Sequence, residues 1–167
     1  MIATSHVIIG SAAAVAVGTA TQNPALGLAA GIVSHFICDS LPHLDFPPSA
    51  QFVDGEIVWD RKMYVFAITD SLIAFGFTLA AWIIRDHFSF TSMLAWGGLG
   101  GYLPDLVDNF PLWRDKVHAL PGFRRFHAFH MWIHDNWRHT YTMPEYWKLG
   151  VITQLVTVIP ALWYLVK

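Results

Sequence analysis

The residues of this chain that could do chemistry are histidines and aspartates, and the densest group of them is His35, Asp39, His43 and Asp45. These four lie within eleven residues, and no other charged side chain precedes Asp45. His35 and Asp39 are four residues apart, so on a helix they share one face. Pro42 would end that helix and turn His43 and Asp45 back towards it. Proteins supply nitrogen and oxygen ligands to Zn²⁺, Mn²⁺ or iron in this way.

Three further carboxylates and one early histidine extend this set. Asp70 lies inside an apolar run, where a carboxylate is costly unless a partner neutralises it. No Lys or Arg lies inside an apolar run, so we expect the partner to be a metal or a histidine. Asp105 and Asp108 follow the next apolar run and could present two carboxylates on one turn. His6 begins the first apolar run.

A histidine stripe follows these carboxylates. His127, His130 and His134 have the spacing i, i+3, i+7, which puts them on one face of a helix. The same segment is rich in aromatic residues, so it could lie at a membrane interface as an amphipathic lid. We expect His130 or His127 to act as a general acid or to orient the substrate. For any single histidine, a structural or surface role remains the alternative.

Composition indicates the elements that must position these groups. Of 167 residues, 54% are hydrophobic and 13% are charged, about half the charged fraction of roughly 25% in soluble domains. Apolar runs cover residues 7–21, 24–40, 63 to 82 or 85, 88–104 and 149–166. We therefore predict an all-α fold, a polytopic membrane helical bundle of four to five helices. The alternative is a compact soluble helical bundle.

The chain reads as one membrane-embedded domain, residues 1–167, with an internal repeat. One hairpin spans about 1–46 and a second about 63–110, because their Leu-Pro pairs recur 62 residues apart. A chance likeness of two apolar hairpins is the alternative. A His-rich interfacial segment then covers about 111–148, and a final helix covers about 149–167.

Alternating helices would bring all of these polar groups to the same end of the bundle. Eight of the ten Lys and Arg residues lie in the loops 46–62 and 105–148, which share that end with the N-terminus. Because positive charge marks the cytoplasmic side, we expect the N-terminus and the site to be cytoplasmic. A net charge of −2 offers no basic field for nucleic acid.

Three short motifs resemble those of a known family. They are Ser34-His35-x-x-x-Asp39, Leu103-Pro104-Asp105-x-x-Asp108 and His6-x-x-x-Gly10. Together they resemble the membrane-bound metal-dependent hydrolases, also described as LexA-binding, inner-membrane-associated hydrolases. The His-x-x-x-Asp helix is also similar to part of the metal site of zinc-dependent phospholipase C. The resemblance implies metal ligation by His6, His35, Asp39, Asp105 and Asp108, and a location in the bacterial inner membrane.

These observations predict a membrane-bound metal-dependent hydrolase that acts on a phosphoester or lipid-like substrate through a metal-activated water. We expect one or two divalent ions, zinc first, with manganese or iron as alternatives. The predicted metal ligands are His6, His35, Asp39, His43, Asp45, Asp70, Asp105, Asp108 and His134. The expected partners are the lipid bilayer and a lipid or phosphorylated amphiphile. Metal-ion transport, metal binding without hydrolysis, and a scaffold with structural histidines are the alternatives.

Overall fold

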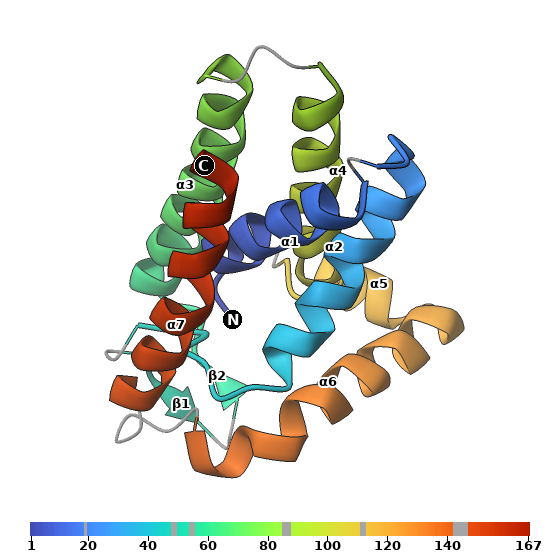
Figure 1. The fold of residues 1–167 in the computed structure, drawn as a ribbon. Coiled ribbons are helices and arrows are strands. Elements are labelled where there is room, and N and C mark those ends of the chain that lie inside the picture. Colours follow the sequence, from blue (N-terminus) through green and yellow to red (C-terminus); the bar gives the residue numbers. More distant parts are fainter. Residues whose placement is uncertain (19, 48–49, 54–55, 85–87, 111–112, 142–146) are drawn as a thin grey trace.

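The computed structural model describes residues 1–167 except 19, 48–49, 54–55, 85–87, 111–112 and 142–146, and the described chain is almost entirely helical (Figure 1). Its helices are α1 (Ala3–Gly18), α2 (Pro24–Asp39), α3 (Arg61–Ile84), α4 (Phe88–Asp108), α5 (Arg114–His118), α6 (Pro121–Tyr141) and α7 (Trp147–Val166). The prediction of a helical fold is therefore confirmed. The loop 46–62 contains a short hairpin that was not predicted. Its strands, β1 (Phe52–Val53) and β2 (Glu56–Ile57), have two residues each and pair antiparallel.

The ends of two helices follow from their local sequence. The side chain of Asn23 accepts a hydrogen bond of 3.0 Å from the amide of Ala25, and Pro24 occupies the first position of α2. This is the arrangement that satisfies free amides at a helix start. Asp60 plays the same part for α3, because its Oδ1 accepts from the amide of Met63 at 2.9 Å.

The structure corrects one helix boundary that matters for the site. We expected the fourth helix to stop at Pro104, but α4 continues to Asp108. Pro104 lacks an amide for one hydrogen bond of the helix, but the Asn109 amide closes the next turn on the Asp105 carbonyl at 2.8 Å. Asp105 and Asp108 therefore lie within α4, in its last two turns, rather than after it.

The helices α1, α2 and α4 touch backbone to backbone through glycines. A methyl group on Gly10 would lie 2.5 Å from the carbonyl oxygen of Gly97. A methyl group on Gly31 would clash with the same oxygen and would lie 2.8 Å from the amide nitrogen of Gly101. Side chains cannot be accommodated at this contact, so the glycines set the distance between the three helices.

The remaining helices surround this three-helix contact. The core includes Ile8, Val15, Met93 and Leu94, and Leu165 of α7 packs into it. α7 packs against α1, and α3 packs against α1 and α4. Figure 1 shows α6 running across one end of the molecule.

Two helices are long and apolar enough to cross a membrane, by length and composition only. They are Arg61–Ala80 of α3 and Trp147–Val166, which is α7. The helices α1 and α2 are apolar too, but each has 16 residues. Among the described residues, two of the four or five predicted spans therefore meet this criterion.

The glycine contact predicts the outcome of a matched pair of substitutions. Gly31→Ala should lower stability by about 1–3 kcal/mol, because overpacking forces the backbones apart. Gly76→Ala is the control, since a methyl group there meets nothing within 4 Å, and alanine should favour the helix by about 1 kcal/mol. Thermal unfolding followed by circular dichroism in detergent measures both. Equal midpoints for the two variants would contradict the backbone contact.

Candidate metal centre

The buried carboxylate of Asp39 lies at the middle of the predicted site. Asp39 is the last residue of α2, and its side chain is fully buried. The Nε2 atom of His6 lies 3.1 Å from its Oδ1. The Nε2 atoms of His35 and His130 lie 2.9 and 3.2 Å from its Oδ2. Since these histidines belong to α1, α2 and α6, the site joins three helices that are distant in the sequence.

Asp39 also faces the loop after α2 and the next turn of α6. The Nε2 atom of His134 lies 3.2 Å from Oδ2, and that of His43 lies 3.8 Å from Oδ1. His43 Nε2 is 2.9 Å from Asp45 Oδ1, and His134 Nδ1 is 3.9 Å from Asp45 Oδ2. The amino group of Met1 lies 2.9 Å from Asp39 Oδ1 and 2.6 Å from Asp45 Oδ1.

The electrostatics of these groups favour positive charge. Burial opposes an ammonium ion, yet Asp39 and Asp45 raise the pKa of the Met1 amino group to about 11. Burial alone would raise the pKa of the Asp45 carboxyl, but the charges of His43 and Met1 hold that pKa well below its usual range. Burial likewise opposes an imidazolium, yet hydrogen bonds to Asp108 and Asp39 raise the pKa of His130 to about 9. The centre therefore stabilises a cation.

Backbone carbonyls decide which ring nitrogens of two histidines carry the proton. The Nδ1–H of His35 donates to the carbonyl of Gly101 at 2.8 Å, and the Nδ1–H of His43 donates to the carbonyl of Leu41 at 2.6 Å. A carbonyl oxygen only accepts, so Nδ1 holds the proton and the neutral ring has its lone pair on Nε2. These Nε2 atoms face the carboxylates, as those of metal ligands with a supporting acceptor do.

The same assignment holds for His130 and produces a conflict that a cation resolves. Its Nδ1–H donates to Asp108 Oδ2 at 2.9 Å. The Nε2 atoms of His130 and His35 lie 3.1 Å apart, and both face Oδ2 of Asp39. The raised pKa of His130 means that a proton on its Nε2 separates these atoms at neutral pH, and a metal ion could take the place of that proton.

The ring of His6 is buried and poorly hydrogen-bonded. Its side chain is inaccessible to solvent, and neither ring nitrogen makes a hydrogen bond of good geometry with the described residues, although Nε2 lies 3.1 Å from Asp39 Oδ1. An unpaired buried nitrogen costs about 1–3 kcal/mol. The ring stacks on that of His35, with centroids 4.0 Å apart. A metal ion beside both rings would accept the free lone pair of His6.

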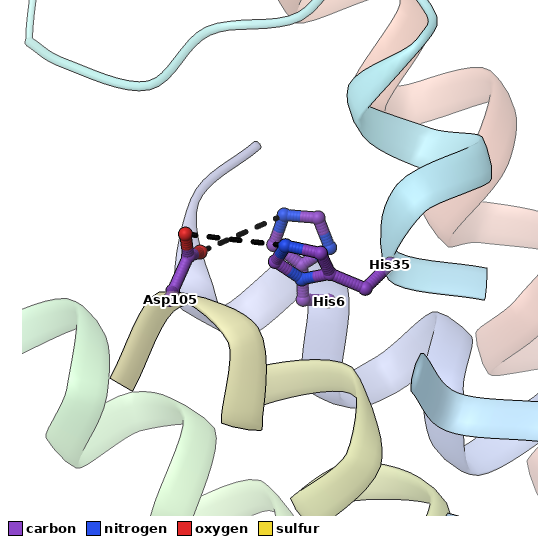
Figure 2. A group of neighbouring side chains, drawn as sticks. All are labelled: His6, His35 and Asp105. Carbon is purple, nitrogen blue, oxygen red and sulfur yellow. Dashed lines mark ion pairs between the residues drawn. The ribbon is translucent and has the colours of Figure 1, made fainter. Parts of the chain in front are cut away.

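The carboxylate of Asp105 faces the rings of His6 and His35 (Figure 2). Its carboxylate oxygens lie 3.8 Å from His6 Nε2 and 4.0 Å from His35 Nε2. Each ligand atom sits about 2.0–2.2 Å from a bound zinc ion, so two ligands of one ion are at most about 4.4 Å apart. Asp105 is 20% exposed, which leaves an open side for water or substrate.

Three sets of possible ligands overlap around Asp39, and within each set the ligand atoms lie within 4.8 Å of one another. The sets are His6–His35–Asp105, His35–Asp39–His130 and Asp39–His43–His134. The first and third sets share no residue, so they could hold two ions at once. Each set has three protein ligands, which leaves a fourth position of a tetrahedral ion free.

Asp70, predicted as a metal ligand, lies outside these sets. Its carboxylate accepts hydrogen bonds from the amides of Ala3 at 2.6 Å and Thr4 at 3.1 Å, and from the Thr4 hydroxyl. Asp70 of α3 thus satisfies free amides at the start of α1, as a helix cap does. Its partners are amides and a hydroxyl, whereas we expected a metal or a histidine.

The structure places Asp108 and His127 beside the Asp39 centre rather than around it. Asp108 is 1% exposed and accepts hydrogen bonds from His127, His130 and His118. His118, in the short helix α5, was not among the predicted residues. It is nine residues from His127, which matches neither a helical nor a strand period, so the sequence carries no signal for this pairing.

No family model, curated protein or solved structure matches this chain. The resemblance to metal-dependent hydrolases therefore stays a prediction, and the function has to be argued from the geometry.

The position of Asp70 predicts that its substitution lowers stability without changing metal binding. Asp70→Ala should lower stability by about 0.5–2 kcal/mol through loss of the α1 cap, while the metal content per folded chain stays at the wild-type value. Asp39→Ala is the comparison and should lose metal. Elemental analysis together with thermal unfolding measures both quantities. Equal loss of metal in the two variants would make Asp70 a ligand.

Proposed function

We propose that this protein is a membrane-bound metal-dependent hydrolase. The observation that carries the proposal is the convergence of imidazole nitrogens on the buried Asp39 carboxylate. The Nε2 atoms of His35 and His130 are 3.1 Å apart, and the ring nitrogens of His6 have no hydrogen-bond partner of good geometry in the described part of the chain. Such an arrangement can hold a metal ion in place of a proton, and the donors suit zinc, manganese or iron.

In this proposal the two sets without a shared residue hold one ion each. His6, His35 and Asp105 form one, and Asp39, His43 and His134 form the other. Divalent ions there would supply an activated water and would polarise a phosphoryl or acyl oxygen. Asp105 and His134, 20% and 12% exposed, line the side from which a substrate would enter.

His130 is then free to hold and move a proton at Nε2. This atom lies 3.2 Å from Asp39 and 3.9 Å from Asp105, between the two sets. Asp108 fixes the ring through Nδ1 at 2.9 Å, which keeps Nε2 pointed into the site. A positioned imidazole of this kind acts as a general acid or base. His127 contacts Asp108 and supports His130 through it.

The membrane location rests on the outer faces of α3 and α7. Large apolar side chains there are well exposed, and the most exposed on α3 are Leu72, Phe75 and Ile83, with Val156, Trp163 and Val166 on α7. Exposed apolar faces of this extent are typical of contact with lipid. We propose that α1–α2 and α3–α4 are duplicated hairpins of a polytopic bundle, with the N-terminus and the site on the cytoplasmic side of a bacterial inner membrane.

The substrate class follows from α6. One face of this helix carries His130 and His134 into the site, while Phe129 and Trp132 are 47% and 62% exposed. A helix with histidines on one face and aromatics on another suits the membrane interface. A lipid or phosphorylated amphiphile could present its polar group to the site from there.

Metal-ion transport, the second candidate, would need polar groups through the whole bundle. Beyond the site, the described core contains a cluster of apolar side chains, Ile8, Val15, Met93, Leu94 and Leu165 among them. A centre open at one end and closed by an apolar core at the other favours hydrolysis at a surface.

The proposal predicts the metal content of the purified protein. Wild type in detergent should hold one or two equivalents of zinc, manganese or iron, and a His35→Ala/Asp39→Ala variant should lose them. Ser11→Ala is the control, because it removes a buried hydrogen bond of 3.0 Å to Leu94 in the same bundle. Elemental analysis after reconstitution measures the difference. Absence of metal from wild type would overturn both hydrolysis and metal transport.

The proposed role of His130 predicts that its substitution lowers kcat without lowering the metal content. His130→Gln should lower kcat on a chromogenic phosphodiester by about 100- to 10,000-fold, since a general acid or base contributes that much, with the metal content unchanged. A parallel loss of metal would instead make His130 a ligand, and an unchanged kcat would remove it from the mechanism.

A further inference from the structure

A second group of side chains, formed by Asp108, His118 and His127, lies outside the proposed catalytic centre. They come from the last turn of α4, from α5 and from α6. The Nε2 atom of His118 lies 2.8 Å from Asp108 Oδ1, and the Nδ1 atom of His127 lies 3.0 Å from the same oxygen. The three ligand atoms all lie within 4.8 Å of one another.

The two imidazoles of this group are arranged side by side. Their ring centroids are 4.1 Å apart, with 34° between the planes, and one nitrogen of each ring points at the same carboxylate oxygen. Two imidazoles and a carboxylate in this arrangement provide three ligands and leave a fourth position open.

These rings differ from those of the buried centre in how they are held. The nitrogens that face Asp108 donate to it, and the opposite nitrogens, Nδ1 of His118 and Nε2 of His127, have no hydrogen-bond partner within the described ranges. Each ring can therefore shift its proton to that outer nitrogen when an ion takes up the lone pair beside Asp108. The side chains of His118 and His127 are 20% and 31% exposed, so an ion can enter and leave from solvent.

We infer that Asp108, His118 and His127 form a separate, solvent-exchangeable binding site for a divalent metal ion of the zinc class. The site is connected to the catalytic centre through one side chain, because Oδ1 of Asp108 faces the new site while Oδ2 accepts the Nδ1–H of His130 at 2.9 Å. An ion here would link α4, α5 and α6 and would fix the carboxylate that orients His130.

The test is equilibrium dialysis of the full chain in detergent against buffered zinc, with bound zinc counted per chain. Wild type should bind one ion more than His118→Ala or His127→Ala. Lys116→Ala is the matched control, because it changes an exposed residue of the same short helix and should bind as wild type does. Equal zinc in wild type and both histidine variants would overturn the inference, and the three residues would then be a hydrogen-bonded support only.

The same comparison in the His35→Ala/Asp39→Ala background separates this inference from the proposed function. That variant should keep one ion, and adding His118→Ala should remove it. If His35→Ala/Asp39→Ala binds as much zinc as wild type, the proposed catalytic metal centre is wrong, and the inferred second site is unaffected by that result. If adding His118→Ala to that variant does not change the bound zinc, the second site is wrong, and the proposed catalytic centre is unaffected.

Discussion

The backbone contact between α1, α2 and α4 is the constraint on which the rest of this structure depends. Each helix has a glycine where the backbones touch, and each has a candidate ligand one helical turn from that glycine. His6 is four residues from Gly10, His35 four from Gly31, and Asp105 four from Gly101. Since residues four apart share a helix face, the contact that excludes side chains at the glycines forces these groups together one turn away.

Bringing these side chains together places electron-rich atoms close to one another. The hydrogen bonds around the site fix where the protons of its histidines lie. Carbonyl oxygens hold the protons of His35 and His43 on Nδ1, and Asp108 does so for His130. The Nε2 atoms of His35 and His43 then face the carboxylates without a proton, and the Met1 amino group lies 2.9 Å from Asp39 as a cation. We propose that a metal ion bound among these groups would further stabilise this end of the bundle.

The predictable part of the structure was the part with a local pattern. Apolar runs gave the helices, and the four-residue spacing of His35 and Asp39 put both on one face of α2. Contacts without a local pattern were not foreseeable. Asp70 caps α1 from another helix, and His118 reaches Asp108 from a short helix at no regular spacing. Pro104 predicted the end of a helix, yet α4 continues past it to Asp108.

The distribution of polarity along the bundle decides which chemistry the fold can support. Every candidate ligand around Asp39 lies where α1 begins, α2 ends and α4 ends, and α6 crosses that end (Figure 1). Deeper in the described part of the bundle lie the glycine contact and a cluster of apolar side chains. Asp105 and His134 are the more exposed members of the three ligand sets around Asp39, at 20% and 12%. That geometry suits a reaction in which substrate arrives at, and product leaves from, one face of the protein.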